Sequence, residues 1–72
     1  MSLQDAILQE MLAEKIPATV YLMNGFQMRG IITGYDSCVL VLVTDGKQQM
    51  LYKHSISTIA PIRPLRSAAP KN

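Results

Sequence analysis

Closely spaced turn signals most constrain what this chain can fold into. Asn24-Gly25, Asp36-Ser37 and Asp45-Gly46 divide the sequence after its first quarter into short segments. These segments are rich in β-branched and aliphatic residues, which favours strands. We therefore predict strands over residues 18–23, 26–35, 39–43, 48–53 and 56–60. Gly30 and Gly34 lie inside the second strand, where glycine usually marks a bend or bulge that lets a short sheet curl.

The residues before the first strand carry the pattern of one amphipathic helix. Ser2 is a favourable N-cap, and Asp5 lies three residues later, where the acidic residue of a capping box is found. An aliphatic stripe follows at helical spacing: Leu3, Ile7, Leu8, Met11 and Leu12. Pro17 disfavours the helical region for the residue before it. A helix over residues 3–15 is therefore predicted, with its aliphatic stripe packed on the sheet.

The small size of the chain favours self-assembly. A chain of 72 residues buries only about 60% of its unfolded surface, so its core alone is marginal. Cys38 is the only cysteine, which excludes an internal disulfide, and Cys38 with His54 offers too few ligands for a structural zinc. The hydrophobic content of 49% is more than one small barrel can hide. The first and last strands would leave unpaired edges, and head-to-tail pairing of such edges between copies would close a ring.

Charge and hydropathy outline the rest of the organisation. The longest apolar run, residues 39–43, is too short to cross a membrane, and the N-terminus has no signal-peptide pattern. With one free thiol and no export signal, we expect a cytoplasmic protein. The net charge is only +2, with acidic residues gathered near the N-terminus and basic residues near the C-terminus. We predict one domain over residues 1–61 and a short flexible basic tail over residues 62–72.

One short cluster has the chemistry of nucleic-acid recognition. Tyr52, Lys53 and His54 place an aromatic ring, an ammonium group and an imidazole on three successive residues. A phosphate needs a cation, a nucleobase can stack on a ring, and a base edge or ribose hydroxyl needs a nearby donor or acceptor. A lone histidine such as His54 is more often structural. Cys38, beside the apolar run that begins at Val39, is expected to be a small buried hydrophobe.

Two stretches resemble the Sm motifs of the Hfq family of bacterial RNA chaperones. The run from Val20 to Gly30, followed by Gly34-Tyr35-Asp36, is similar to the first motif, and residues 52–58 resemble the second, in which Tyr-Lys-His is diagnostic. The resemblance covers about residues 2–61. It implies a mainly β fold, an N-terminal α-helix followed by a five-stranded, strongly bent Sm-like (SH3-like) open barrel. It further implies a homohexameric ring that binds RNA on two opposite faces without a cofactor or metal.

The resemblance also assigns the RNA-binding residues of each face. The helix-bearing face, for uridine-rich RNA, falls on Gln4, Ser37, Cys38, Tyr52, Lys53 and His54. The opposite face, for adenine-rich RNA, falls on Tyr21, Gly25, Phe26, Gln27, Met28, Arg29 and Gln49. By analogy, Lys53 and His54 reach base and ribose oxygens, Gln4 bonds a uracil edge, Tyr21 stacks and Gln49 bonds an adenine edge. The implied function is to bring small regulatory RNAs and mRNAs together in post-transcriptional regulation and stress response, and so to affect translation and RNA stability.

The sequence departs from the family pattern at two places. In many members the position of Cys38 carries an aromatic residue that stacks on uracil, and such stacking is worth about 1–3 kcal/mol per base. We therefore expect weaker uridine binding. The rim retains only Lys15, where the best-studied annealing surfaces carry an arginine cluster. The adenine-binding face is the most complete of the sites.

Two readings from other classes remain open at this point. An enzyme could use Cys38 as nucleophile, His54 as base and Asp36 to orient the base, although no phosphate loop, nucleophile elbow or spare metal ligand accompanies them. A small-barrel interaction module without specific RNA binding could dock peptides on an edge strand, or use Pro61-x-x-Pro64. Tyr21 and Phe26 could then simply pack across their hairpin.

Overall fold

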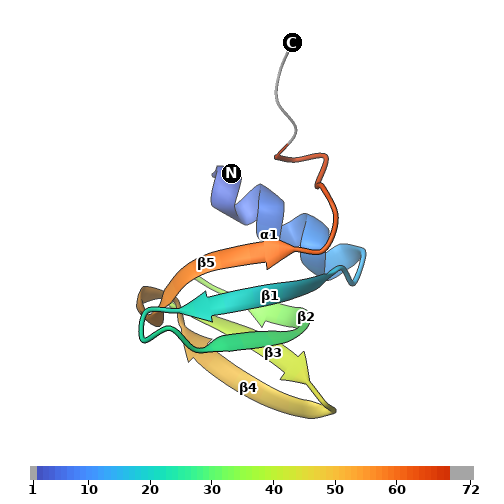
Figure 1. The fold of residues 1–72 in the computed structure, drawn as a ribbon. Coiled ribbons are helices and arrows are strands. Elements are labelled where there is room, and N and C mark those ends of the chain that lie inside the picture. The colour runs from blue at the N-terminus through green and yellow to red at the C-terminus, as the bar shows by residue number, and fades with distance from the viewer. Residues whose placement is uncertain (1, 69–72) are drawn as a thin grey trace.

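A short helix and a five-stranded antiparallel sheet make up residues 2–68, the part of the chain that the computed structural model describes (Figure 1). The elements in chain order are α1 (Leu3–Ala13), β1 (Pro17–Leu22), β2 (Gln27–Tyr35), β3 (Val39–Thr44), β4 (Lys47–Tyr52), the 3-10 turn η1 (Lys53–Ser55) and β5 (Ile56–Pro61). The predicted order of one helix followed by five strands is confirmed. Within residues 2–68, no helix is long and apolar enough to cross a membrane.

The helix α1 begins at its predicted cap and ends earlier than predicted. The Ser2 hydroxyl accepts the Asp5 N–H at 3.1 Å. Lys15 adopts a left-handed φ of 51°, and the N–H groups of Lys15 and Ile16 donate to carbonyls one turn back, Leu12 at 3.3 Å and Met11 at 3.0 Å. This pair of bonds is the Schellman ending of a helix. The helix therefore stops at Ala13 and not at residue 15, because the chain reverses at Lys15 before Pro17 is reached.

Two tight hairpins follow the two Asx-Gly signals. Asp45 and Gly46 have φ values of 52° and 75°, the two left-handed residues of a type I′ turn between β3 and β4. The β1–β2 loop, residues 23–26, is two residues longer. Gly25, with φ of 93°, is the only residue of that loop with a positive φ, and its N–H donates to the Leu22 carbonyl at 3.0 Å. The Asn24 side chain fixes the end of the loop before β2, because its Oδ1 accepts the Phe26 N–H at 3.0 Å.

The strand order β4-β3-β2-β1-β5 leaves β4 and β5 as the open edges. The sequence predicted β1 at an edge, and this is wrong because β5 folds back along β1 and pairs with it from Ala18↔Pro61 to Leu22↔Ile56. The ladder between β2 and β3 is irregular between Ile32 and Gly34, which places a bulge beside Gly34, the second of the two glycines in β2. The first glycine, Gly30, allows the backbone of β3 to approach closely. These two positions give the sheet its bend.

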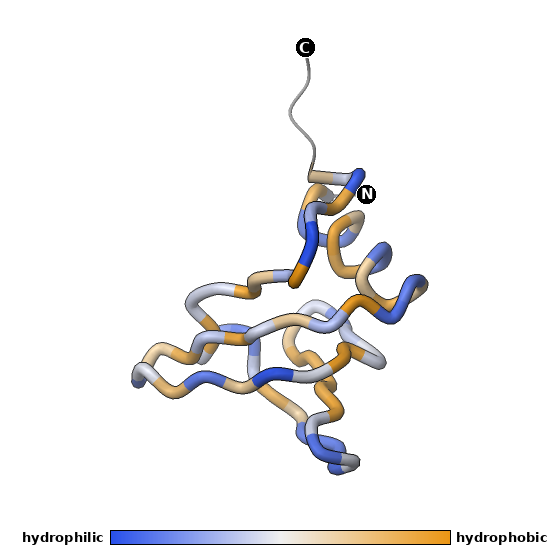
Figure 2. The backbone as a smooth tube through the Cα atoms, turned by 45° about the vertical axis from the view of Figure 1, so that its right-hand side comes forward, coloured by the Kyte–Doolittle hydropathy of each residue, from blue (hydrophilic) through white to orange (hydrophobic). Residues whose placement is uncertain are grey.

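The core lies between α1 and the concave side of the sheet. Fully buried side chains from the helix and three strands fill it: Leu8, Met11, Val20, Ile32, Leu40 and Leu42. β3 is hydrophobic throughout residues 39–43, and the tip of the β3–β4 hairpin is hydrophilic (Figure 2). Leu3, predicted to pack with the helix stripe, is 64% exposed and lines the open groove between α1 and β5.

Residues 62–68 depart from the expected flexible tail. The segment runs back beside α1 in Figures 1 and 2. Leu65 is 5% exposed and belongs to the core cluster, and the Arg63 guanidinium lies 2.7 Å from the Glu14 carboxylate. The burial of the Leu65 side chain holds this segment in place. The prediction of a flexible tail missed this contact because it relied on the basic and proline-rich composition of the segment. The rest of the predicted tail, residues 69–72, lies outside the described residues.

Candidate nucleic-acid interface

The predicted cationic cluster spans the junction of β4 and η1. Tyr52 ends β4, and its ring centroid lies 5.8 Å from that of His54, with the two planes 31° apart. The Lys53 ammonium lies 5.5 Å from the centroid of the Tyr35 ring, within the range of a cation–π interaction. Tyr35 itself donates its hydroxyl to the Asp5 carbonyl of α1 at 3.3 Å. A chain of contacts from the helix therefore positions the Lys53 side chain.

Tyr35 is a positioning residue that sequence reasoning missed. It stands in the Gly34-Tyr35-Asp36 stretch of the first motif, but nothing in the sequence places it near Lys53, eighteen positions further on. The contact arises because β2 ends beside the start of η1. A tyrosine at the last residue of a long strand was the only available signal.

Gln4 and Lys53 line the same groove between α1 and β5. The groove has a volume of about 420 Å³, and its other lining residues are mainly aliphatic: Leu3, Ile7, Leu8, Ile56, Ser57, Thr58 and Ile59. The structure thus brings together an amide from the helix start and an ammonium from η1. Both groups are on an otherwise apolar wall, where a hydrogen bond to a ligand competes with less water.

The turn between β2 and β3 adjoins this groove. The Cys38 carbonyl accepts the Lys53 N–H at 2.8 Å, which ties the turn to η1. Asp36 shapes the turn, because its Oδ1 accepts the N–H groups of Cys38 and Val39, each at 2.8 Å. These two bonds, that from Cys38 first, lower the pKa of the Asp36 carboxyl below its ordinary value.

Cys38 is exposed, so the expectation of a buried small hydrophobe is wrong. It precedes β3 and stands on the turn, outside the sheet. Its thiol contacts the neighbouring Ser37 hydroxyl, with an Sγ–Oγ distance of 3.7 Å. The Asp36 carboxylate bonds the backbone of the turn, and the Cys38 thiol contacts the Ser37 hydroxyl. Neither Asp36 nor Cys38 is arranged with His54 as the nucleophile, base and orienting residue of an enzyme would be.

The second predicted set of residues gathers around the β1–β2 hairpin. Tyr21 pairs with Gln27 across the two strands, and Arg29 stands one pleat further along the same face, opposite Thr19. Phe26 is 70% exposed at the end of the loop, which excludes simple packing of its ring across the hairpin.

Three other positions complete this part of the site. Met23, in the same loop, is 68% exposed and was not predicted; a methionine beside a turn signal was its only cue. Met28 points to the opposite side of β2 and packs partly against the core. Gln49 lies on β4, which β3 separates from β2, so a single domain does not bring Gln49 into the Tyr21 group.

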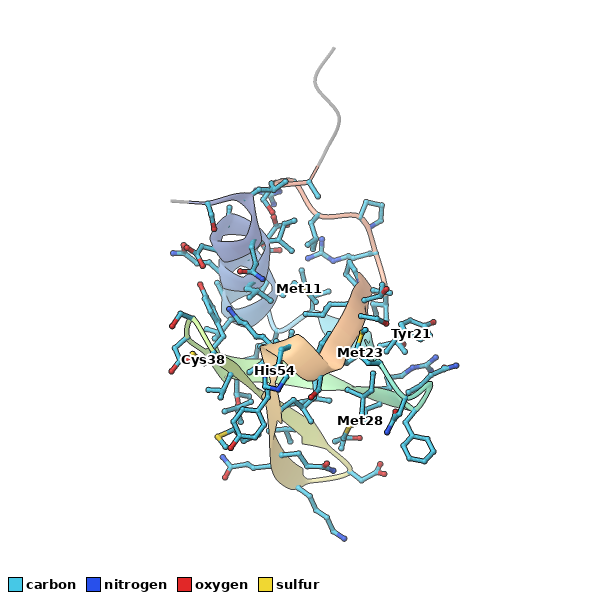
Figure 3. The ribbon with its side chains drawn as sticks, turned by 90° about the vertical axis from the view of Figure 1, so that its left-hand side faces the viewer. Met11, Tyr21, Met23, Met28, Cys38 and His54 are labelled. Carbon is cyan, nitrogen blue, oxygen red and sulfur yellow. The ribbon has the colours of Figure 1, made fainter. Side chains whose placement is uncertain are left out.

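The two sets lie at different sides of the domain but meet at η1. Figure 3 shows Tyr21, Met23 and Met28 on one side, Cys38 on the other, and His54 on η1 between them. The Met23 N–H donates to the Ser55 carbonyl at 2.8 Å, so the hairpin loop is fixed to the end of the cationic turn. Lys15 is exposed at the end of α1, apart from both sets.

An N-terminal helix packed on five strongly bent antiparallel strands, with a short 3-10 turn before the last strand, defines the class of Sm-like small barrels. Comparison with known proteins narrows the class. The family model described as Hfq protein matches residues 3–66. The chain is 48% identical to the RNA-binding protein Hfq of Desulforamulus reducens over 99% of this chain and 89% of that protein. It is 52% identical to the RNA-binding protein Hfq of Alkaliphilus metalliredigens over 89% and 80%, respectively.

A solved structure agrees with these sequence matches. A crystal structure of Hfq, described as a pleiotropic translational regulator, superposes with a TM-score of 0.80 at 44% identity, covering 82% of this chain and 98% of that one. The chain belongs to the Hfq family.

Proposed function

We propose that this protein is an RNA chaperone that binds single-stranded RNA at two separate sites and thereby promotes the pairing of small regulatory RNAs with mRNAs in the cytoplasm. The observation that most supports this function is the ring of Phe26, which is 70% exposed on a domain whose relatives are named RNA-binding proteins. An aromatic ring left in water costs free energy, and a nucleobase that stacks on it recovers that cost. The consequence is regulation of translation and RNA stability without covalent chemistry.

The hairpin site has the properties needed for adenine-rich RNA. Tyr21 and Phe26 supply rings, Arg29 a guanidinium and Gln27 an amide on adjoining positions of β1 and β2. The left-handed Gly25 presents backbone without a side chain beside Phe26. Stacking with amide bonds to a base edge distinguishes bases, while Arg29 attracts any phosphate. Met28, on the core side of β2, and Gln49, on β4, do not reach this group within one domain.

The groove site has the properties needed for uridine-rich RNA. Lys53 and Gln4 can bond the two carbonyl oxygens and the N–H of uracil, and His54 can bond a ribose hydroxyl. Ser37 and Cys38 do not line the groove, but they belong to the turn whose Cys38 carbonyl accepts the Lys53 N–H. Because Cys38 lacks a ring, uridine-rich RNA is bound more weakly than adenine-rich RNA.

Assembly into a homohexameric ring follows from the open edges β4 and β5. The β4 edge presents exposed apolar side chains, Met50 at 56% and Tyr52 at 53%. The β5 edge is bordered by the aliphatic groove between α1 and β5. The two edges differ, so pairing β4 of one copy with β5 of the next is head to tail, and it closes a ring when six such steps complete a full turn. Each copy then contributes one groove and one hairpin, on opposite faces of the ring.

Fluorescence-anisotropy titrations with labelled oligo-A and oligo-U at two salt concentrations test the proposal. Binding of oligo-A that is tighter than that of oligo-U and persists at the higher salt supports base recognition at the hairpin. Weak binding of both that disappears with salt reduces the interaction to phosphate attraction and contradicts the proposal.

A further inference from the structure

The segment that follows β5 is bound along the outer side of α1 by three kinds of contact. We call residues 63–67 the strap. Leu65 enters the core with 5% exposure. Arg63 pairs with Glu14 at 2.7 Å, and the backbone N–H groups of Arg66 and Ser67 donate to the two oxygens of Glu10 at 3.0 and 2.9 Å. The strap therefore meets both carboxylates with positive or donor groups.

Glu10 and Glu14 need such partners because they are one helical turn apart. Like charges at this spacing face the same side of a helix and repel each other. The N–H bonds from Ser67 and Arg66 lower the pKa of Glu10, so they favour its charged form. Without the strap, the side of α1 would present two adjacent negative charges to any approaching phosphate.

The ion pair contributes little to holding the strap in place. Arg63 and Glu14 are 48% and 38% exposed, and exposed ion pairs add little to stability, whereas Leu65 is buried. What the pair changes is the field at the lateral surface of the domain. Arg63 and Arg66, distant in sequence from the helix, bring positive charge to a surface where the helix itself ends in the single cation Lys15.

We propose that the strap is a charge mask, in which Arg63 neutralises Glu14 while the backbone N–H groups of Arg66 and Ser67 bond the still ionised Glu10, so that RNA strands bound to the two faces can pass along the lateral surface and meet. This inference rests on the proposed RNA-chaperone function. Its chemical target is the phosphate backbone, and no base is recognised. In the mask, Arg63 acts by neutralising Glu14 and does not touch the phosphate. An experiment that removes Glu14 can therefore distinguish the mask from a direct contact between Arg63 and phosphate.

A double-mutant cycle of charge-removing substitutions tests the mask. The variants are Arg63→Gln, Glu14→Gln and the double variant, with Lys47→Gln as a control that removes one exposed cation from the β3–β4 hairpin. The readout is the annealing rate of two complementary RNAs, one with an oligo-A and one with an oligo-U segment, beside the affinities for short oligo-A and oligo-U. We expect Arg63→Gln to slow annealing by about threefold or more and Glu14→Gln to accelerate it, since local fields of this kind change association rates.

The double variant and the control decide the mechanism. Restoration of the wild-type rate in the double variant, with a smaller effect of Lys47→Gln, supports the mask. A double variant as slow as Arg63→Gln would mean that Arg63 contacts phosphate directly, and an equal loss in Lys47→Gln would mean that only net charge matters; either overturns it. Normal oligonucleotide binding with no change in any annealing rate overturns the mask alone, whereas a wild-type protein that binds neither oligonucleotide overturns the proposed function itself.

Discussion

At the scale of single residues, exposure separates side chains that bind ligands from those that pack. Phe26 and Met23 are mostly exposed although they are apolar, and Met28, two residues beyond Phe26, points to the core. The alternation of a strand decides this difference, because successive side chains face opposite sides of the sheet. Substitutions at exposed positions can therefore report on binding without a loss of folding.

The two proposed sites predict opposite specificities for single substitutions. Phe26→Ala should weaken oligo-A binding by about tenfold, or about 1.4 kcal/mol, within the range of one lost stacking interaction, and should leave oligo-U unaffected. Lys53→Ala should do the reverse. Anisotropy titrations of both variants with both RNAs give the comparison. Equal losses on the two RNAs would refute the assignment of separate sites.

Glu10 predicts an acid-dependent contribution to stability. Its pKa is lowered from the ordinary 4.5, first by the backbone N–H of Ser67 and then by that of Arg66. A carboxyl with a lowered folded pKa stabilises the fold above its unfolded pKa, and this contribution is lost as the pH falls through the folded pKa. The difference in unfolding free energy between wild type and Glu10→Gln should thus be constant near neutral pH and shrink below pH 4.5.

Denaturant titrations at a fixed protomer concentration measure this difference, since assembly makes apparent stability concentration-dependent. Asp36 also has a lowered pKa, but it is present in both proteins and cancels in the comparison. A difference that is the same at pH 7 and pH 3 would show that the bonds of Glu10 to the strap do not depend on its charge.

At the scale of elements, the bend of β2 depends on its two glycines in different ways. A Cβ on Gly30 would collide with the carbonyl oxygen of Val43, a backbone atom that cannot move aside alone. A Cβ on Gly34 would lie 4.0 Å from Val41 Cγ2, an ordinary contact. The sequence marks both glycines alike, and only the register between β2 and β3 distinguishes them.

The two glycines therefore make a matched pair of substitutions. Gly30→Ala should destabilise the fold by about 3 kcal/mol, the upper part of the range for overpacking, because a strand must shift. Gly34→Ala should change the unfolding free energy by less than about 1 kcal/mol, since its backbone needs no positive φ. Thermal and denaturant unfolding of both variants test this. A similar loss in both would mean that the bend depends on flexibility at β2 and not on the close approach at Gly30.

At the scale of the whole molecule, the two open edges are joined in sequence by η1, which carries Lys53 and His54. Pairing of β4 with β5 of the next copy in the proposed ring therefore places the cationic turn of each copy near an interface. We therefore expect the proposed RNA binding at the groove to depend on assembly of the ring. The hairpin site on β1 and β2 lies in the interior of the sheet order and should depend less on assembly.

A charge placed on the β4 edge should separate assembly from folding. Met50→Glu should shift the protein from the proposed hexamer to smaller species in sedimentation-velocity experiments, because an exposed apolar side chain of β4 becomes charged. Phe26→Glu is the matched control, since Phe26 is also an exposed apolar residue but lies away from both edges. An unchanged mass for Met50→Glu, or an equal shift for Phe26→Glu, would contradict pairing through the β4 edge.

The sequence by itself determined the local structure and the family. The cap at Ser2, the Asx-Gly turns and the β-branched segments between them act through neighbours a few residues apart, so their signals can be read along the chain. Only the tertiary structure decided which strands form the edges, that Cys38 is exposed, that Tyr35 positions Lys53, and that residues 62–68 pack on α1. Each of these depends on contacts between residues far apart in sequence, and the free energy of such contacts leaves no periodic pattern in the chain.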